Sequence, residues 1–140
     1  MTDWTRDMVE DRVVEAAAVL KKLPGPRAQG YFSTRPDMLL SAREIARQEP
    51  KPMNVRPSPQ SISRMEETLT WNRFLGPDDC HLMWARAEGV PWKGVCYRFG
   101  ISRPTAHRRY DYALSAIAWR LNGRQVHHRR GRRFVVAQAR

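Results

Sequence analysis

Three arginines lie within seven residues of one amphipathic stretch, and they are the side chains in this sequence best suited to chemistry. They are Arg103, Arg108 and Arg109, and His107 lies among them. An arginine guanidinium presents a planar fork of N–H donors that matches a phosphate group or the O6 and N7 edge of guanine. The residue types and their spacing therefore favour binding of DNA over catalysis.

These arginines belong to a predicted helix over residues 103–121. At 100° per residue, the apolar side chains of this stretch share one face and a polar set points the other way. The apolar set is Ala106, Tyr110, Ala113, Leu114, Ile117 and Leu121. The outward set is Pro104, Arg108, Asp111 and Ser115, with Thr105 and His107 on its flanks. We expect the outward face to be the one that meets DNA.

The residues before this helix complete the pattern of a helix-turn-helix, which we predict over 91–121. A first helix over 92–99 has one apolar edge, and Gly100 supplies the left-handed backbone conformation that ends a helix at low cost. Ser102 is a good N-cap for the second helix, and Pro104 suits its first turn, where no backbone hydrogen bond is lost. An ordinary helical hairpin with a solvated polar face is the alternative. The three arginines favour the DNA-binding interpretation.

The side chains around this turn have predicted roles on DNA. Arg103 and Arg108 are the candidates for bidentate contacts to guanine. Lys93 and the backbone N–H groups at the start of the first helix are expected to hold an adjacent phosphate. The residues expected to contact phosphates or base edges are Thr105, His107 and Arg109, with Pro104 on the same surface.

The positive charge of the chain is concentrated in its second half. The net charge is +11; residues 1–70 hold 11 Lys and Arg against 10 Asp and Glu, whereas residues 71–140 hold 14 against 4. A basic segment beside a helix-turn-helix is expected to follow phosphates or enter the minor groove. A disordered tail is the alternative, and Phe134 to Val136 are apolar enough to dock on a protein. The predicted DNA contacts in this segment are Arg124, Arg129, Arg130, Arg132 and Arg133.

The chain is predicted to be all-α, a helical domain with a C-terminal trihelical helix-turn-helix and a proline-rich central connector. Its 140 residues allow one modest core, and 41% hydrophobic with 28% charged residues is the balance of a soluble globular protein. Seven of its ten prolines lie in residues 24–59. We divide the chain into an N-terminal helical segment with this connector (1–60), a helix-turn-helix domain (61–123) and a basic C-terminal arm (124–140).

The remaining helices follow from apolar periodicity and capping residues. A helix is predicted over 5–23 with Thr5 as its N-cap, and others over 34–46, 59–74 and 77–88. We expect the stripe of the first helix to pack on the chain's own core rather than in a dimer interface. That stripe is Met8, Val9, Val13, Ala16, Ala17 and Leu20.

Neither an enzyme nor a cofactor or metal site is expected. The sequence has no Ser/His/Asp or Cys/His set, no metal motif and no glycine-rich phosphate loop. No run near the N-terminus resembles a signal peptide or a membrane span. The spacing of Cys80, His81, Cys96 and His107 matches no common zinc template.

Two resemblances add to this interpretation. Residues 100–114, G-I-S-R-P-T-A-H-R-R-Y-D-Y-A-L, are similar in outline to the helix-turn-helix of region 4 of bacterial sigma factors, which implies the fold and DNA binding rather than sigma activity. Nearly the whole chain resembles a family of small proteins of alphaproteobacterial prophages and gene-transfer-agent-like elements, to which no activity is assigned. Residues 4–12, 30–36 and 84–93 carry that second resemblance.

We therefore predict a sequence-specific, phage- or prophage-type transcription regulator that places residues 103–121 in the major groove of double-stranded DNA. Two alternatives are a small terminase-like DNA-packaging subunit and a factor that docks on RNA polymerase. A homodimer or higher oligomer is compatible with each of them. The expected location is the bacterial cytoplasm, associated with the nucleoid and not with a membrane.

Overall fold

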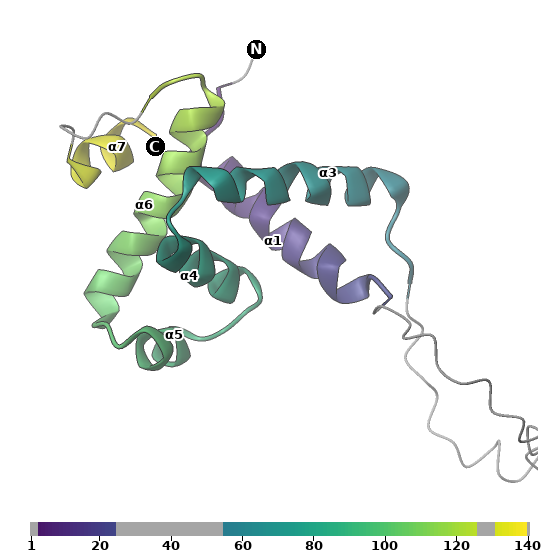
Figure 1. The fold of residues 1–140 in the computed structure, drawn as a ribbon, viewed down its shortest axis with the longest axis horizontal. Helices are drawn as coiled ribbons and strands as arrows, with labels where there is room; N and C mark the ends of the chain where they lie inside the picture. The colour runs from purple at the N-terminus through teal and green to yellow at the C-terminus, as the bar shows by residue number, and fades with distance from the viewer. Residues whose placement is uncertain (1–2, 25–54, 126–130, 140) are drawn as a thin grey trace, which may run out of the picture.

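The computed structural model describes residues 3–24, 55–125 and 131–139, and every regular element in these ranges is a helix (Figure 1). The predicted all-α class is therefore confirmed. The helix predicted over 34–46 and most of the proline-rich connector lie outside the described residues. The elements are α1 (Arg6–Lys22), α3 (Pro59–Thr70), the 3-10 turn η1 (Trp71–Phe74), α4 (Pro77–Ala87), α5 (Trp92–Phe99), α6 (Arg103–Leu121) and α7 (Arg132–Gln138).

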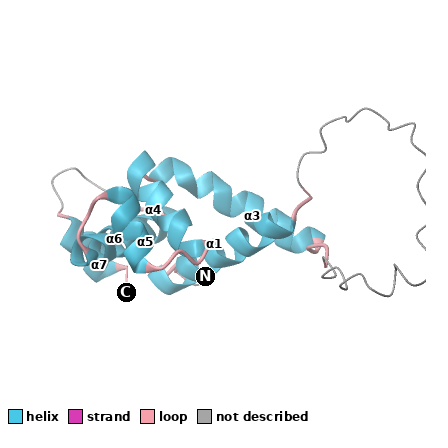
Figure 2. Ribbon diagram, turned by 90° about the horizontal axis from the view of Figure 1, so that it is seen from below, coloured by secondary structure: helices cyan, strands magenta, loops and turns pink. Residues whose placement is uncertain are grey.

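Helices α1 and α3 lie side by side and lead away from the other helices (Figures 1 and 2). Each begins where the sequence predicts. The Thr5 hydroxyl accepts a hydrogen bond from the Met8 amide at 3.3 Å, and the Ser58 hydroxyl accepts one from the Ser61 amide at 3.2 Å. These caps satisfy amide groups that have no partner inside the helix.

The apolar stripe predicted on α1 is partly wrong. Met8 and Leu20 are 37% and 39% exposed, whereas Val19, which the prediction left out, is buried. Helical periodicity gives the direction of an apolar face but not the width that neighbouring helices cover. The buried residues of α1 are Val9, Val13, Ala16, Ala17 and Val19, and they pack within the chain as expected.

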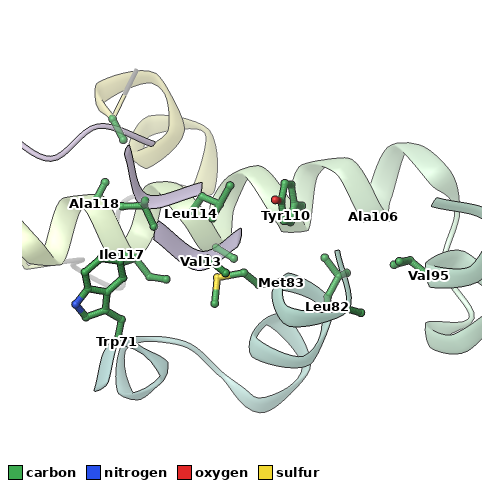
Figure 3. Close-up of a cluster of buried hydrophobic side chains, with 14 residues drawn as sticks. Val13, Trp71, Leu82, Met83, Val95, Ala106, Tyr110, Leu114, Ile117 and Ala118 are labelled. Carbon is green, nitrogen blue, oxygen red and sulfur yellow. The ribbon is translucent and has the colours of Figure 1, made fainter. Parts of the chain in front are cut away.

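Helix α6 is the centre of the core, because it contacts α1, α4, α5, η1 and α7. In Figure 3 its inward side chains face Trp71 of η1 and residues of α4, α5 and α1. Full burial of a large aliphatic side chain is worth roughly 1.5–3 kcal/mol, so this cluster supplies most of the stabilisation of the fold. The largest fully buried side chains of α4 and α6 are Leu82, Met83, Leu114 and Ile117.

The turn between α5 and α6 has the backbone that the sequence predicts. Gly100 lies at φ 62° and ψ 35°, and the Ile101 amide donates to the Cys96 carbonyl at 3.2 Å. The cap at Ser102 differs from the prediction, since its hydroxyl lies 2.9 Å from the Thr105 hydroxyl and makes no hydrogen bond to a backbone amide. Ser102 still has the extended backbone of an N-cap, so the helix starts at the predicted position.

Helix α7 folds back onto the outer side of α6 (Figure 1). Val135 is 1% exposed, and the ring of Phe134 lies 6.0 Å from the ring of Trp119 in an edge-on contact. Ser115 of α6, which the helical period places on the outward face, is 0% exposed, so that prediction is wrong. Val135, from the apolar stretch for which docking on a protein is the alternative, is buried within the chain itself.

The two ends of the described chain meet beside α6. The Trp4 amide donates to Oδ1 of Asn122 at 2.7 Å, and Nδ2 of Asn122 donates to the Trp4 carbonyl at 2.9 Å. The Arg6 amide donates to the Ala139 carbonyl at 3.1 Å. These bonds tie the start of α1 to the end of α6 and to the end of α7. In the described part of the chain, no helix has the length and apolar character needed to cross a bilayer.

Candidate nucleic-acid interface

The first two turns of α6 form a polar surface next to α5. Arg103, Pro104, His107 and Arg108 are exposed there, and Thr105 is half-buried. Arg109 is also half-buried. Ala106 and Tyr110 point into the core from the same turns (Figure 3). The division predicted from the helical period therefore holds over the first two turns, and it fails only further along, at Ser115.

A stack of rings fixes the position of His107. Its ring lies 3.8 Å from the Trp92 ring at an interplanar angle of 29°, and Trp92 meets Tyr110 edge-on at 5.6 Å. The guanidinium of Arg86 lies 4.2 Å from the Trp92 ring centre, and its Nη1 donates to the Val90 carbonyl at 2.6 Å. Stacking leaves the ring nitrogens of His107 at an edge, where they can meet a DNA group without a further loss of side-chain freedom.

A network of charged groups joins α1 to α6. Arg6 donates from Nη1 to Asp7 at 2.8 Å and to Glu10 at 3.0 Å, and from Nε to Asp111 at 2.9 Å. The Tyr110 hydroxyl donates to Glu10 at 2.9 Å. Only an arginine offers enough donors in one plane for three carboxylates. The network thereby holds α6 at a fixed rotation relative to α1.

Two pKa shifts report on this network. Burial raises the pKa of Tyr110, and the hydrogen bond to Glu10 with its negative charge raises it further, so the phenol stays neutral well above its ordinary value of 10.0. Burial lowers the pKa of Arg6, but the hydrogen bond to Asp7 and the charges of Glu10 and Asp111 outweigh burial, and the net shift is upward. Arg6 is therefore a permanent cation.

Two predicted sets of DNA-contacting residues meet in one groove between α6 and α7. The groove has a volume of about 680 Å³, and four arginines line it, Arg108 and Arg109 from α6 and Arg132 and Arg133 from α7. The guanidinium of Arg132 lies 4.9 Å from the centre of the Tyr112 ring. The other lining residues are Thr105, Asp111, Tyr112, Val136 and Ala137. Tertiary structure thus joins the start of α6 to part of the C-terminal segment.

A smaller hollow of about 160 Å³ adjoins this groove at the start of α4. Arg109 and Arg132 line it together with Asp78 and Asp79. The sequence marked these acids as residues that suit the positive end of a helix, and both lie in the first turn of α4. They also bring negative charge close to two of the four groove arginines.

The remaining predicted contacts lie elsewhere. Lys93 is exposed on the first turn of α5. Arg124 follows the far end of α6, where its guanidinium lies 5.1 Å from the Trp119 ring centre, and the 19 residues of α6 separate the two ends by about 28 Å. Arg124 therefore does not join the groove. Arg129 and Arg130 lie outside the described residues.

The structure also brings forward residues that the sequence interpretation did not select. Tyr97, 92% exposed on α5, lies one turn after Lys93, and that spacing was the only available signal for it. Tyr112 and Arg6 act through the ring contact and the charge network, and no local motif indicates either role. No three His, Cys, Asp or Glu side chains within the described ranges are arranged to hold a metal ion.

Residues 21–117 match a family model described as a domain of unknown function, DUF6362. The chain belongs to this family. The match includes the turn at Gly100 and most of α6, and it ends before α7. Comparison with curated proteins and with solved structures found no match. Only one wall of the groove between α6 and α7 therefore belongs to the matched family region. The α6 arginines lie inside this region, and the α7 arginines lie outside it.

Proposed function

We propose that this DUF6362 protein is a sequence-specific DNA-binding protein, a transcription regulator of phage or prophage type, that places the first two turns of α6 in the major groove. The exposed polar start of α6 carries the proposal, because it follows the left-handed turn at Gly100 and sits on a rigid core. A short helix, a glycine turn and a second helix with outward arginines is the arrangement that helix-turn-helix proteins use on DNA.

Each exposed side chain has a role in this proposal. Arg103 and Arg108 read guanine through O6 and N7, because both are exposed and their guanidinium groups have no ion-pair partner among the described residues. His107, held against Trp92, and Thr105 contact phosphates or base edges from the flanks. Pro104 supplies apolar contact on the same surface.

Contacts to the DNA phosphate backbone come from residues outside the first two turns of α6. Lys93 on α5 meets one flanking phosphate, and the arginines of the C-terminal segment meet others. Binding of this kind weakens with salt, with log K falling by about 0.9 for each neutralised phosphate per unit of log salt. Affinity should therefore depend on salt much more steeply than sequence preference does.

The test compares two single substitutions on a DNA sequence selected from a random pool. Arg108→Ala should cost about 1–3 kcal/mol on that sequence and relax preference at one base position. Lys93→Ala should weaken binding to all sequences alike and lower the salt slope by about 1. Arg120→Ala is the matched control, since Arg120 is an exposed arginine in the last turn of the same helix. Unchanged sequence preference in Arg108→Ala would show that Arg108 reads no base and that the proposed orientation of α6 on DNA is wrong.

The solution mass of the protein distinguishes the regulator from its competitors. A dimer whose selected DNA is a palindrome, with half-sites about one helical turn apart, is the expected result. A large ring that retains packaging-site DNA would favour a small terminase-like subunit instead. Enrichment of no sequence, together with binding to RNA polymerase, would favour a polymerase-docking factor.

A further inference from the structure

We propose that the groove between α6 and α7 binds consecutive phosphates of one strand of the DNA that α6 contacts, and that Arg6 keeps this groove available without touching DNA. The proposal rests on the proposed function and specifies where the arginines of α7 meet phosphates. The groove places Arg108 and Arg109 on one wall and Arg132 and Arg133 on the other. Helix α7 thereby becomes part of the binding surface.

The four guanidinium groups are free to bind an anion. None of them forms an ion pair within the described part of the chain. Arg132 stacks on the Tyr112 ring, which restrains the side chain and leaves its N–H edges open to solvent. Cations that line one groove raise its potential and attract a polyanion.

The shape of the groove fits a strand better than a single phosphate group. Its α6 wall runs from Thr105 to Tyr112, which is about 10 Å along the helix axis. Phosphates of one DNA strand follow one another by about 3.4 Å of rise along the duplex axis and also wind around it, so a wall of this length faces about two of them. The arginines are spread over two helices instead of converging on one point.

One carboxylate, that of Asp111, lines the groove beside the arginines. Asp111 is three residues after Arg108, a spacing at which the two side chains could pair on the helix surface. Instead, Oδ1 of Asp111 accepts a hydrogen bond from Nε of Arg6 at 2.9 Å and lies 2.8 Å from Nη2 in an ion pair. Arg6 therefore pairs with the carboxylate from the side of α1, and Asp111 forms no ion pair with a groove arginine in the described structure.

Two more acids limit the strength of this site. Asp78 and Asp79 line the adjoining hollow with Arg109 and Arg132. In the described structure, neither acid forms an ion pair with either arginine. Their charge offsets part of the attraction that these two arginines exert on a phosphate. Arg133 does not line that hollow and should be the strongest phosphate ligand of the groove, whereas Arg108, which also lies outside the hollow, is the arginine proposed to read guanine.

The first experiment measures the salt dependence of binding to a duplex of arbitrary sequence by fluorescence anisotropy, with the full chain. Arg132→Ala/Arg133→Ala should lower the slope of log K against log salt by about 1.8, the value for two phosphate contacts. The charge-matched control is Arg56→Ala/Arg120→Ala, which removes two exposed arginines outside the groove. Equal losses in the two double variants would overturn the proposal, because net charge alone would then account for the binding.

The second experiment is a double-mutant cycle on Arg6 and Asp111. Arg6→Ala should weaken binding about fivefold, because the freed carboxylate can pair with the groove arginines. Asp111→Asn alone should leave the affinity unchanged or raise it, and Arg6→Ala/Asp111→Asn should recover the Asp111→Asn value. A double variant as weak as Arg6→Ala would show that Arg6 acts only by supporting the fold. If Arg6→Ala does not fold, Asp78→Asn/Asp79→Asn still tests phosphate binding in the groove: binding should strengthen about threefold, and an unchanged affinity would overturn that part of the proposal.

A third measurement separates a DNA strand from a small phosphate ligand. Pyrophosphate should compete with the duplex only as strongly as chloride does at equal ionic strength. Stronger competition that disappears in Arg132→Ala/Arg133→Ala would assign the groove to a free phosphate compound and overturn the strand proposal. Failure of the proposed function would look different. Arg108→Ala would then leave the sequence preference intact, whereas the salt slope of Arg132→Ala/Arg133→Ala would still show whether the groove binds phosphates.

Discussion

Replacing Gly100 with alanine would put a methyl group on a backbone held at φ 62° and ψ 35°. An ideal Cβ at this position meets no heavy atom within 4 Å, so the change tests the backbone conformation and not the packing. An L-residue in the left-handed helical conformation costs roughly 1–2 kcal/mol. Alanine also restricts the unfolded chain more than glycine does, which raises the free energy of unfolding by about 0.4–1 kcal/mol. The net destabilisation should be about 1 kcal/mol.

Urea unfolding followed by circular dichroism measures this value. With a slope of about 2 kcal/mol per molar urea, the midpoint of Gly100→Ala should fall by about 0.5 M with an unchanged slope. Gly123→Ala should behave alike, because Gly123 has φ +74° and equally open surroundings. Gly76→Ala is the control, since φ is −69° there and nothing lies within 4 Å. Gly76 is the N-cap of α4, so alanine costs about 0.5–1 kcal/mol there, but the restriction of the unfolded chain offsets most of that and the net change should be a few tenths of a kcal/mol.

The outcome also bears on DNA binding. A loss of about 1 kcal/mol leaves a domain of ordinary stability almost fully folded, so the DNA affinity of Gly100→Ala should stay close to that of the unchanged protein. A destabilisation above about 3 kcal/mol would mean that steric crowding, and not the sign of φ, limits this position. No destabilisation at all would refute the left-handed turn itself.

Two further predictions concern α7 and the contact between α1 and α6. Val135→Ala removes two buried methyl groups, worth about 1.6 kcal/mol before any cavity cost, and should speed amide hydrogen exchange in α7 more than it shifts global unfolding; equal effects on both would show that α7 unfolds only with the core. Tyr110→Phe should remove part of the loss of stability above pH 10, because the raised pKa of Tyr110 keeps the folded phenol protonated while the unfolded phenol ionises. Identical pH profiles of the two proteins in urea melts would contradict that assignment.

The helix boundaries around the turn could be predicted because their causes are local. Helices α5 and α6 span the residues that periodicity and capping indicate. Gly100 permits the left-handed turn, and Pro104 fits a first helical turn that lacks backbone donors anyway. Such preferences depend on neighbours within a few residues. They therefore hold before any tertiary contact forms.

The wrong predictions concern residues whose burial depends on a helix distant in the sequence. The helical period predicts that Ser115 faces outward, opposite the apolar face of α6, but α1 and α7 also contact α6, and the Ser115 hydroxyl is buried without a hydrogen-bond partner in the described structure. Helical periodicity identifies the most apolar face and does not register a second packed face made of small residues. The basic run that contains Arg132 and Arg133 likewise gave no sign that it forms a docked helix.

The sequence by itself determined helices α1, α3, α4, α5 and α6, the turn at Gly100 and the concentration of arginine near the start of α6. Only the tertiary structure decided that Arg132 lies across a groove from Arg109, 23 positions earlier in the chain, and that Arg6 holds Asp111 aside. The physical reason is the range of the interactions. Capping and periodicity act within one or two helical turns, whereas a charged groove exists only after the packing of buried side chains has placed separate helices side by side.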